Sequence, residues 1–231
     1  MRKSVQISLI AVFAALHAVL YFISFGSWRN WGIYLEAIEG IILGPKIGFV
    51  AAFLGSAVAR TIRPDALWMF GIVAEPVSVL MVGFLAKANW KPVLAVYAVM
   101  LSAYFVHPYG RALPLWTILD VLLALVLIYP AARLGKHLFR NDVKRATGAI
   151  VLVSFVCVAT DSLVRVFLLI PCGLYNPFYA GFEALYVDFV GAAASSYFED
   201  VVAVIVSLVV GVPLLTSLSK LKLIEEKGKE K

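Results

Sequence analysis

Long apolar runs separated by short polar loops dominate this chain. Eight apolar segments are visible, at roughly residues 5–25, 33–44, 46–62, 67–86, 92–106, 113–134 and 147–170, and within 181–218, where the apolar core covers 199–218. A helix needs about 20 apolar residues to cross the hydrocarbon core of a bilayer. Because segments 33–44 and 92–106 are short, the pattern predicts an all-α, polytopic membrane bundle of six to eight transmembrane helices.

Composition agrees with a membrane location. Hydrophobic residues make up 62% of the 231 residues and charged residues 15%, whereas soluble domains carry about 25% charged residues. This excludes a soluble enzyme, a secreted disulfide scaffold and a nucleic-acid-binding domain. We expect a multi-pass protein of the cell membrane, in contact with the lipid bilayer, with a single membrane domain at 1–218 and a basic cytoplasmic tail at 219–231.

The basic residues predict the orientation of the chain. If the N-terminus is cytoplasmic and all eight segments cross, fifteen Lys and Arg residues fall in inner loops and the tail, and only four fall in outer loops. Cytoplasmic loops of membrane proteins carry such an excess of Lys and Arg. We therefore expect eight crossings with both termini cytoplasmic.

Small residues at four-residue spacing mark the first helices. The pairs Ala11 and Ala15, and Ala14 and Ala18, lie in the first segment, and glycines follow at 40, 44 and 48. Small residues let helix backbones approach closely in lipid. The alanines either pack within the bundle or form a docking face for a partner protein, and their spacing does not choose between the two.

These features together resemble a known family. A first span with an AxxxA pattern, a polar aromatic loop, and then the run YLEAIEGIILGPKIGFVAAFLGSAVAR are similar to the substrate-binding S component of energy-coupling factor (ECF) vitamin transporters. The resemblance is best over residues 5–90, and we treat 5–137 as the S-component-like part. Because the family's usual core has six spans, residues 147–218 would be additional or divergent helices.

The resemblance implies a function and partners. An S component captures a vitamin or similar micronutrient near the outer face and docks on a transmembrane coupling subunit, which works with two ATPase subunits. Ala11 and Ala15, with Ala14 and Ala18 beside them, would meet the coupling subunit. The chain has no GxxxxGK[ST] motif, so ATP would be used by the partners and we expect no cofactor in this chain.

Ionisable residues at membrane depth are costly and are candidates for function. Asp161 and Arg165 lie four apart on one span and can pair, either as a structural ion pair or in a binding site. Glu199 and Asp200 precede an apolar run, where we expect them to cap a helix N-terminus. Acids outnumber bases in the spans, which favours a ligand with a positive or hydrogen-bond-donating group.

Aromatic and charged residues also gather in three loops predicted to lie on the outer side. Such rings with a few polar groups are typical of a small-molecule pocket, although Trp and Tyr also form interfacial belts in any membrane protein. Together with the acids of the spans, the substrate-binding candidates are Trp28, Trp31, Tyr34, Glu36, Glu39, Arg60, Arg63, Trp68, Glu75, Asp161, Arg165, Tyr175 and Asn176.

Motifs of intramembrane catalysis are missing from the sequence. It contains no GxSxG or HExxH, so we expect a binder without catalytic or metal-ligating residues, in which His17 serves packing or hydrogen bonding. The alternatives are a self-contained secondary transporter, with Asp161 or Glu75 as coupling acid, and an integral membrane enzyme.

Overall fold

The protein is an all-helical bundle in a computed structural model that describes residues 3–23, 30–64, 67–139 and 143–220. The elements are α1 (Lys3–Tyr21), α2 (Ile33–Ile62), α3 (Trp68–Ala86), α4 (Lys91–Val106), α5 (Pro108–Ala112), η1 (Leu115–Ile118), α6 (Leu119–Gly135), α7 (Val143–Leu169) and α8 (Phe182–Lys220). Six of the described helices are long and apolar enough to cross a membrane, and α4 is a shorter apolar helix. The predicted multi-pass helical membrane fold is confirmed.

Helix α2 is a hairpin of two halves. Gly44 has φ +74° and ψ 178°, a conformation that glycine adopts without the steric cost of a Cβ atom. A Cβ atom on Gly48 would lie 3.6 Å from the Cα atom of Gly40, whereas residues eight apart in a straight helix are about 12 Å apart. The chain therefore turns back at Gly44, where the sequence predicts a break between segments 33–44 and 46–62.

Close packing holds this hairpin against α3. A Cβ atom on Gly83 of α3 would lie 2.3 Å from the backbone nitrogen of Pro45. A Cβ atom on Gly40 would lie 2.7 Å from the carbonyl oxygen of Val79. The hairpin tip and α3 can approach this closely only because neither glycine has a side chain.

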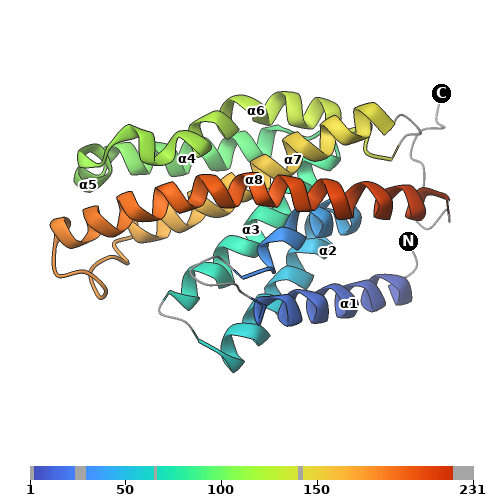
Figure 1. Ribbon diagram of the computed structural model, residues 1–231, viewed down its shortest axis with the longest axis horizontal. Coiled ribbons are helices and arrows are strands. Elements are labelled where there is room, and N and C mark those ends of the chain that lie inside the picture. Colours follow the sequence, from blue (N-terminus) through green and yellow to red (C-terminus); the bar gives the residue numbers. More distant parts are fainter. Residues whose placement is uncertain (1–2, 24–29, 65–66, 140–142, 221–231) are drawn as a thin grey trace.

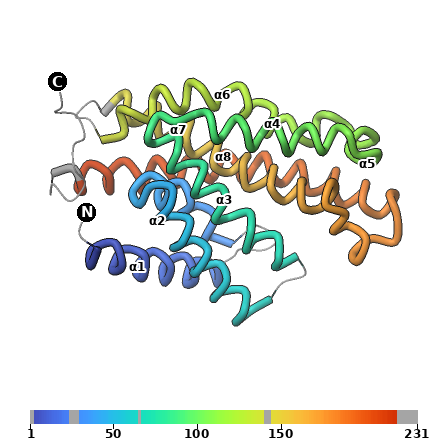
Figure 2. The backbone as a smooth tube through the Cα atoms, turned by 180° about the vertical axis from the view of Figure 1, so that it is seen from behind, coloured from blue at the N-terminus to red at the C-terminus, as the bar shows by residue number. Residues whose placement is uncertain are grey.

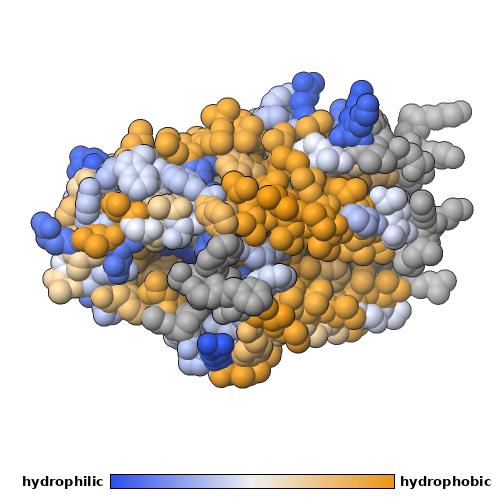
Figure 3. Space-filling model, viewed as in Figure 1, coloured by the Kyte–Doolittle hydropathy of each residue, from blue (hydrophilic) through white to orange (hydrophobic). Residues whose placement is uncertain are grey.

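The core lies around α7, which packs against α2, α3, α4, α6 and α8. Helix α1 lies at one side of the bundle and packs chiefly against α2 (Figures 1 and 2). The start of α1 and the end of α8 lie at the same end of the bundle (Figure 1), as expected of a chain that crosses the membrane an even number of times. Figure 3 shows a broad apolar area across one face, with hydrophilic residues gathered toward the two ends.

The last helix, α8, begins earlier in the chain than the sequence predicts. Helix α8 runs without interruption from Phe182 to Lys220, so Glu199 and Asp200 lie in its middle and cannot cap its N-terminus. Both side chains are buried. The apolar run after residue 199 led to a predicted helix start that is too late, because the small residues before it continue the same helix.

Candidate functional site

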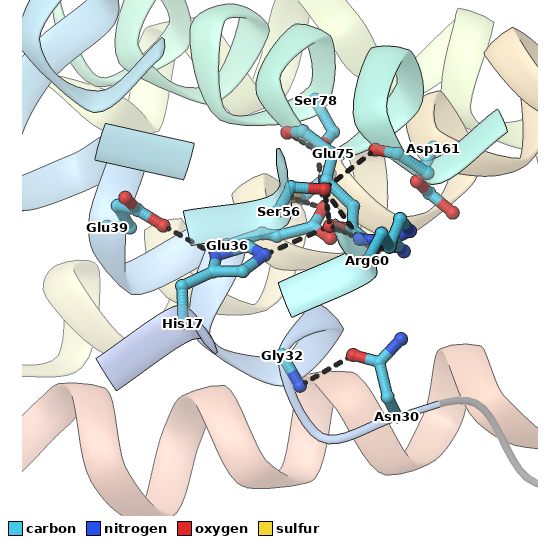
Figure 4. A network of polar contacts seen from close by, with 12 residues as sticks. His17, Asn30, Gly32, Glu36, Glu39, Ser56, Arg60, Glu75, Ser78 and Asp161 are labelled. Atoms are coloured by element: carbon cyan, nitrogen blue, oxygen red, sulfur yellow. Dashed lines mark hydrogen bonds and ion pairs between the residues drawn. The ribbon is translucent and has the colours of Figure 1, made fainter. Parts of the chain in front are cut away.

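Ionisable side chains from several helices meet inside the bundle (Figure 4). They are His17 of α1; Glu36, Glu39 and Arg60 of α2; Glu75 of α3; and Asp161 and Arg165 of α7. All are buried except Arg165, which is half-buried. Since buried charges are costly unless they are paired and hydrogen-bonded, their contacts decide what this site can do.

Glu75 lies at the centre of the network. Arg60 forms a bidentate ion pair with its carboxylate: Nη1 donates to Oε2 at 2.9 Å, and Nη2 donates to Oε1. Ser56 Oγ also donates to Oε2, at 2.7 Å. Ser56 and Arg60 lie four apart on one helix and therefore share a face. Such a two-pronged, charge-assisted contact fixes the carboxylate in one orientation.

His17 connects α1 to this centre. Its Nδ1 lies 3.2 Å from Glu39 Oε2 and its Nε2 lies 3.0 Å from Glu75 Oε2. A neutral imidazole has only one N–H donor. The two contacts are therefore both hydrogen bonds only if the imidazole is protonated or if one of the two carboxyls carries a proton. The arrangement can hold a proton between His17 and the two glutamates.

Glu36 and Asp161 complete the site. Ser78 Oγ donates to Glu36 Oε2, and Cys157 Sγ lies 3.9 Å from the same oxygen. Asp161 forms a two-pronged pair with Arg165, with 2.6 Å from Nε to Oδ2 and 3.2 Å from Nη2 to Oδ1. Within the described residues, Oε1 of Glu36 and Oε1 of Glu39 have no hydrogen-bond partner.

The structure thus brings together six of the predicted substrate-binding residues, which are Glu36, Glu39, Arg60, Glu75, Asp161 and Arg165. Sequence reasoning missed Ser56, Ser78 and Cys157, and it treated His17 as a structural residue. Helical spacing could have indicated both serines, because Ser56 lies one turn before Arg60 and Ser78 lies one turn after Glu75.

The substrate-binding candidates next to the ends of α2 and at the start of α3 lie outside the buried network. Tyr34 is buried and packs edge-to-face with Trp31, at 6.1 Å between ring centroids. Trp31, Trp68 and the side chain of Arg63 are exposed. The backbone carbonyl of Arg63 accepts a hydrogen bond from the hydroxyl of Tyr21, at 2.9 Å. Trp28 lies outside the described residues.

Tyr175 and Asn176 lie in the loop between α7 and α8. The Tyr175 ring packs against Tyr109 and His107, with centroid distances of 4.9 and 6.0 Å. Asn176 is exposed, and its side chain donates to the carbonyl oxygen of Gly173, at 3.0 Å. These contacts join the loop to α5 and to itself, and not to the buried network.

The two alanine pairs of α1 differ in their surroundings. Ala14 and Ala18 are half-buried, whereas Ala11 and Ala15 are exposed. A Cβ atom on Gly55 of α2 would lie 2.7 Å from the carbonyl oxygen of Ala14, so this side of α1 packs tightly within the bundle. Ala11 and Ala15 remain on the surface, and their docking role stays a prediction.

Comparison with known proteins shows limited similarity. No family model matches the chain, and no solved structure matches it. The chain is 26% identical over 169 residues to an uncharacterized protein of Methanocaldococcus jannaschii, in an alignment that covers 70% of this chain and 57% of that protein. Over 53 residues it is 38% identical to a UPF0397 protein of Streptococcus sanguinis, covering 23% of this chain and 29% of that protein. The chain thus spans just over half the length of the first relative. What these findings and the fold establish is a multi-pass helical membrane protein with a short stretch similar to a UPF0397 protein.

Proposed function

We propose that the chain is a membrane-embedded substrate-binding subunit for uptake of a vitamin or similar micronutrient across the cell membrane. It binds its solute at the network around Glu75 and catalyses no reaction. The solute is released after the subunit docks on a separate ECF-type module, made of a transmembrane coupling subunit and two ATPase subunits that hydrolyse ATP.

One observation carries this proposal: seven ionisable side chains from four helices meet inside an apolar bundle, and all of them except Arg165 are buried. Ionisable groups at membrane depth are costly, and a functional role is the first hypothesis for them. Two carboxylate oxygens there have no hydrogen-bond partner among the described residues, as expected of groups that a solute completes. The resemblance of residues 5–90 to S components supports the same function.

The exposed alanines support docking. Ala11 and Ala15 lie one helical turn apart on the outward side of α1, and small residues let a partner helix approach closely in lipid. Replacing both with leucine should leave solute binding intact and abolish uptake, because only the partner contact is blocked.

The test is native mass spectrometry of the purified chain, followed by extraction and identification of any co-purified small molecule. A stoichiometric micronutrient is the expected result. An empty chain that also fails to bind a panel of vitamins would contradict the proposal.

A second function, that of a self-contained secondary transporter, is favoured by the position of His17 between Glu39 and Glu75. Such a bridge can pass a proton between two carboxylates. Proteoliposomes that contain the chain alone separate the two functions. Accumulation of solute driven by a proton gradient would indicate the transporter, whereas solute binding without accumulation would indicate the uptake subunit.

A further inference from the structure

The charges of the buried network do not balance. Arg60 pairs with Glu75 and Arg165 pairs with Asp161, so these four side chains form two neutral pairs. His17 and Glu39 form a third pair, which is neutral both as imidazolium with carboxylate and as imidazole with carboxylic acid. Glu36 remains, and it forms no ion pair with any cation in the part of the chain that the structure describes.

No cation forms an ion pair with Glu36 among the described residues, and the charges of His17 and Arg165 act on it only from a distance. Its Oε2 contacts the Ser78 hydroxyl and the Cys157 thiol, which are both neutral donors. The carboxylates of Asp161 and Glu75 also act on Glu36 and repel a further negative charge there. Its side chain is 0% exposed. A carboxylate in this position needs a positive partner or a proton.

Glu36 and Glu39 each have one carboxylate oxygen that is available to a ligand. Glu36 and Glu39 lie three apart in the first half of α2, so their side chains are neighbours on one face. Oε1 of each is buried and without a hydrogen-bond partner in the part of the chain that the structure describes. Two unpartnered acceptor oxygens one helical turn apart can each accept a hydrogen bond from an N–H group of a cationic nitrogen compound.

We infer that Glu36, with Glu39 beside it, binds a cationic nitrogen group of the solute, such as an ammonium or the protonated ring of a nitrogen heterocycle. This inference rests on the proposed uptake function and names the class of its solute. Two free oxygens suit an organic cation, which needs only one or two acceptors, better than a metal ion such as Ca²⁺, which takes six to eight oxygen ligands.

Helix α1 provides the route to these carboxylates. It covers Glu39 through His17, packs chiefly against α2 and has most of its side chains outside the core. A movement of α1 away from α2 would take His17 from Glu39, and the solute cation would then pair with Glu39 as well as with Glu36.

The experiment measures binding of four probes to the purified full chain in lipid nanodiscs by isothermal titration calorimetry. Thiamine and pyridoxamine carry cationic nitrogen, riboflavin is neutral, and biotin is an anion. We expect at least one cationic probe to bind. Glu36→Gln should weaken that binding by about 10- to 100-fold, the usual effect of losing a hydrogen bond to a charged group.

Glu183→Gln is the matched control, because it makes the same change at an exposed position of α8 and should leave binding unchanged. If Glu36→Gln does not fold, Glu36→Asp keeps the charge, withdraws it by one methylene and should weaken binding by a smaller factor. Binding of riboflavin or biotin that Glu36 variants leave unchanged would overturn the inference while the uptake function stands. Binding of none of the four probes would count against both.

Discussion

The packing of the α2 hairpin on α3 yields a prediction whose size follows from the structure. The change is Gly83→Ala in α3, and its matched control is Gly191→Ala in α8. A Cβ atom at Gly83 would lie 2.3 Å from the nitrogen and 2.5 Å from the Cα atom of Pro45. These are backbone atoms, which cannot turn away as a side chain can. At Gly191 a Cβ atom would meet nothing within 4 Å.

Both substitutions share one favourable effect, because alanine stabilises a helix interior by about 1 kcal/mol relative to glycine. The difference between the two variants therefore isolates the cost of overpacking, which is typically about 1–3 kcal/mol. Since the hairpin tip must move as a unit, we expect the upper part of this range. Gly191→Ala should be neutral or slightly more stable than the unmodified chain.

The free energy of unfolding can be measured by titrating the detergent-solubilised protein with SDS and following tryptophan fluorescence. Refolding on dilution of SDS establishes that the values are equilibrium values. Equal stability of Gly83→Ala and Gly191→Ala would refute the close approach of α3 to the hairpin. A loss of stability in both would point to a general effect of added volume and not to the contact with Pro45.

Three further predictions concern topology, α1 and the buried pair. A membrane-impermeant maleimide should label Cys172, which is exposed, and not Cys157, which is buried. Labelling in intact cells is expected if the α7–α8 loop faces outward. Labelling only in inverted vesicles would show that the orientation is the opposite one. Ala14→Leu should lower the midpoint of SDS unfolding, because Ala14 packs against α2. Ala11→Leu should leave the midpoint unchanged, because Ala11 is exposed. Equal shifts of the midpoint in the two variants would show that both alanines have the same surroundings. Glu75→Ala should cost about 3–5 kcal/mol of unfolding free energy, because it leaves buried Arg60 without its carboxylate; a change below about 1 kcal/mol in the same titration would show that the pair is solvated.

The sequence by itself determines the class of the protein and much of its helix order. In lipid, the backbone N–H and C=O groups of these long apolar runs find hydrogen-bond partners within the run itself when it forms a helix. The positions of the spans therefore follow directly from the pattern of apolar residues. The turn at Gly44 was also readable, because glycine followed by proline interrupts a helical hydrogen-bond pattern. Local spacing likewise paired Asp161 with Arg165, since residues four apart share a helix face.

Only the tertiary structure decided which polar residues meet. His17 and Glu75 are 58 positions apart in the chain, and their contact depends on how α1 and the hairpin pack on α3. The same packing brought Arg60 to the buried centre and left Arg63 exposed three residues later. It also separated Ala14 from Ala11, although both belong to the same spacing pattern. Periodicity tells which residues share a face of a helix, but the neighbour of that face is set by packing between distant segments, which no local pattern records.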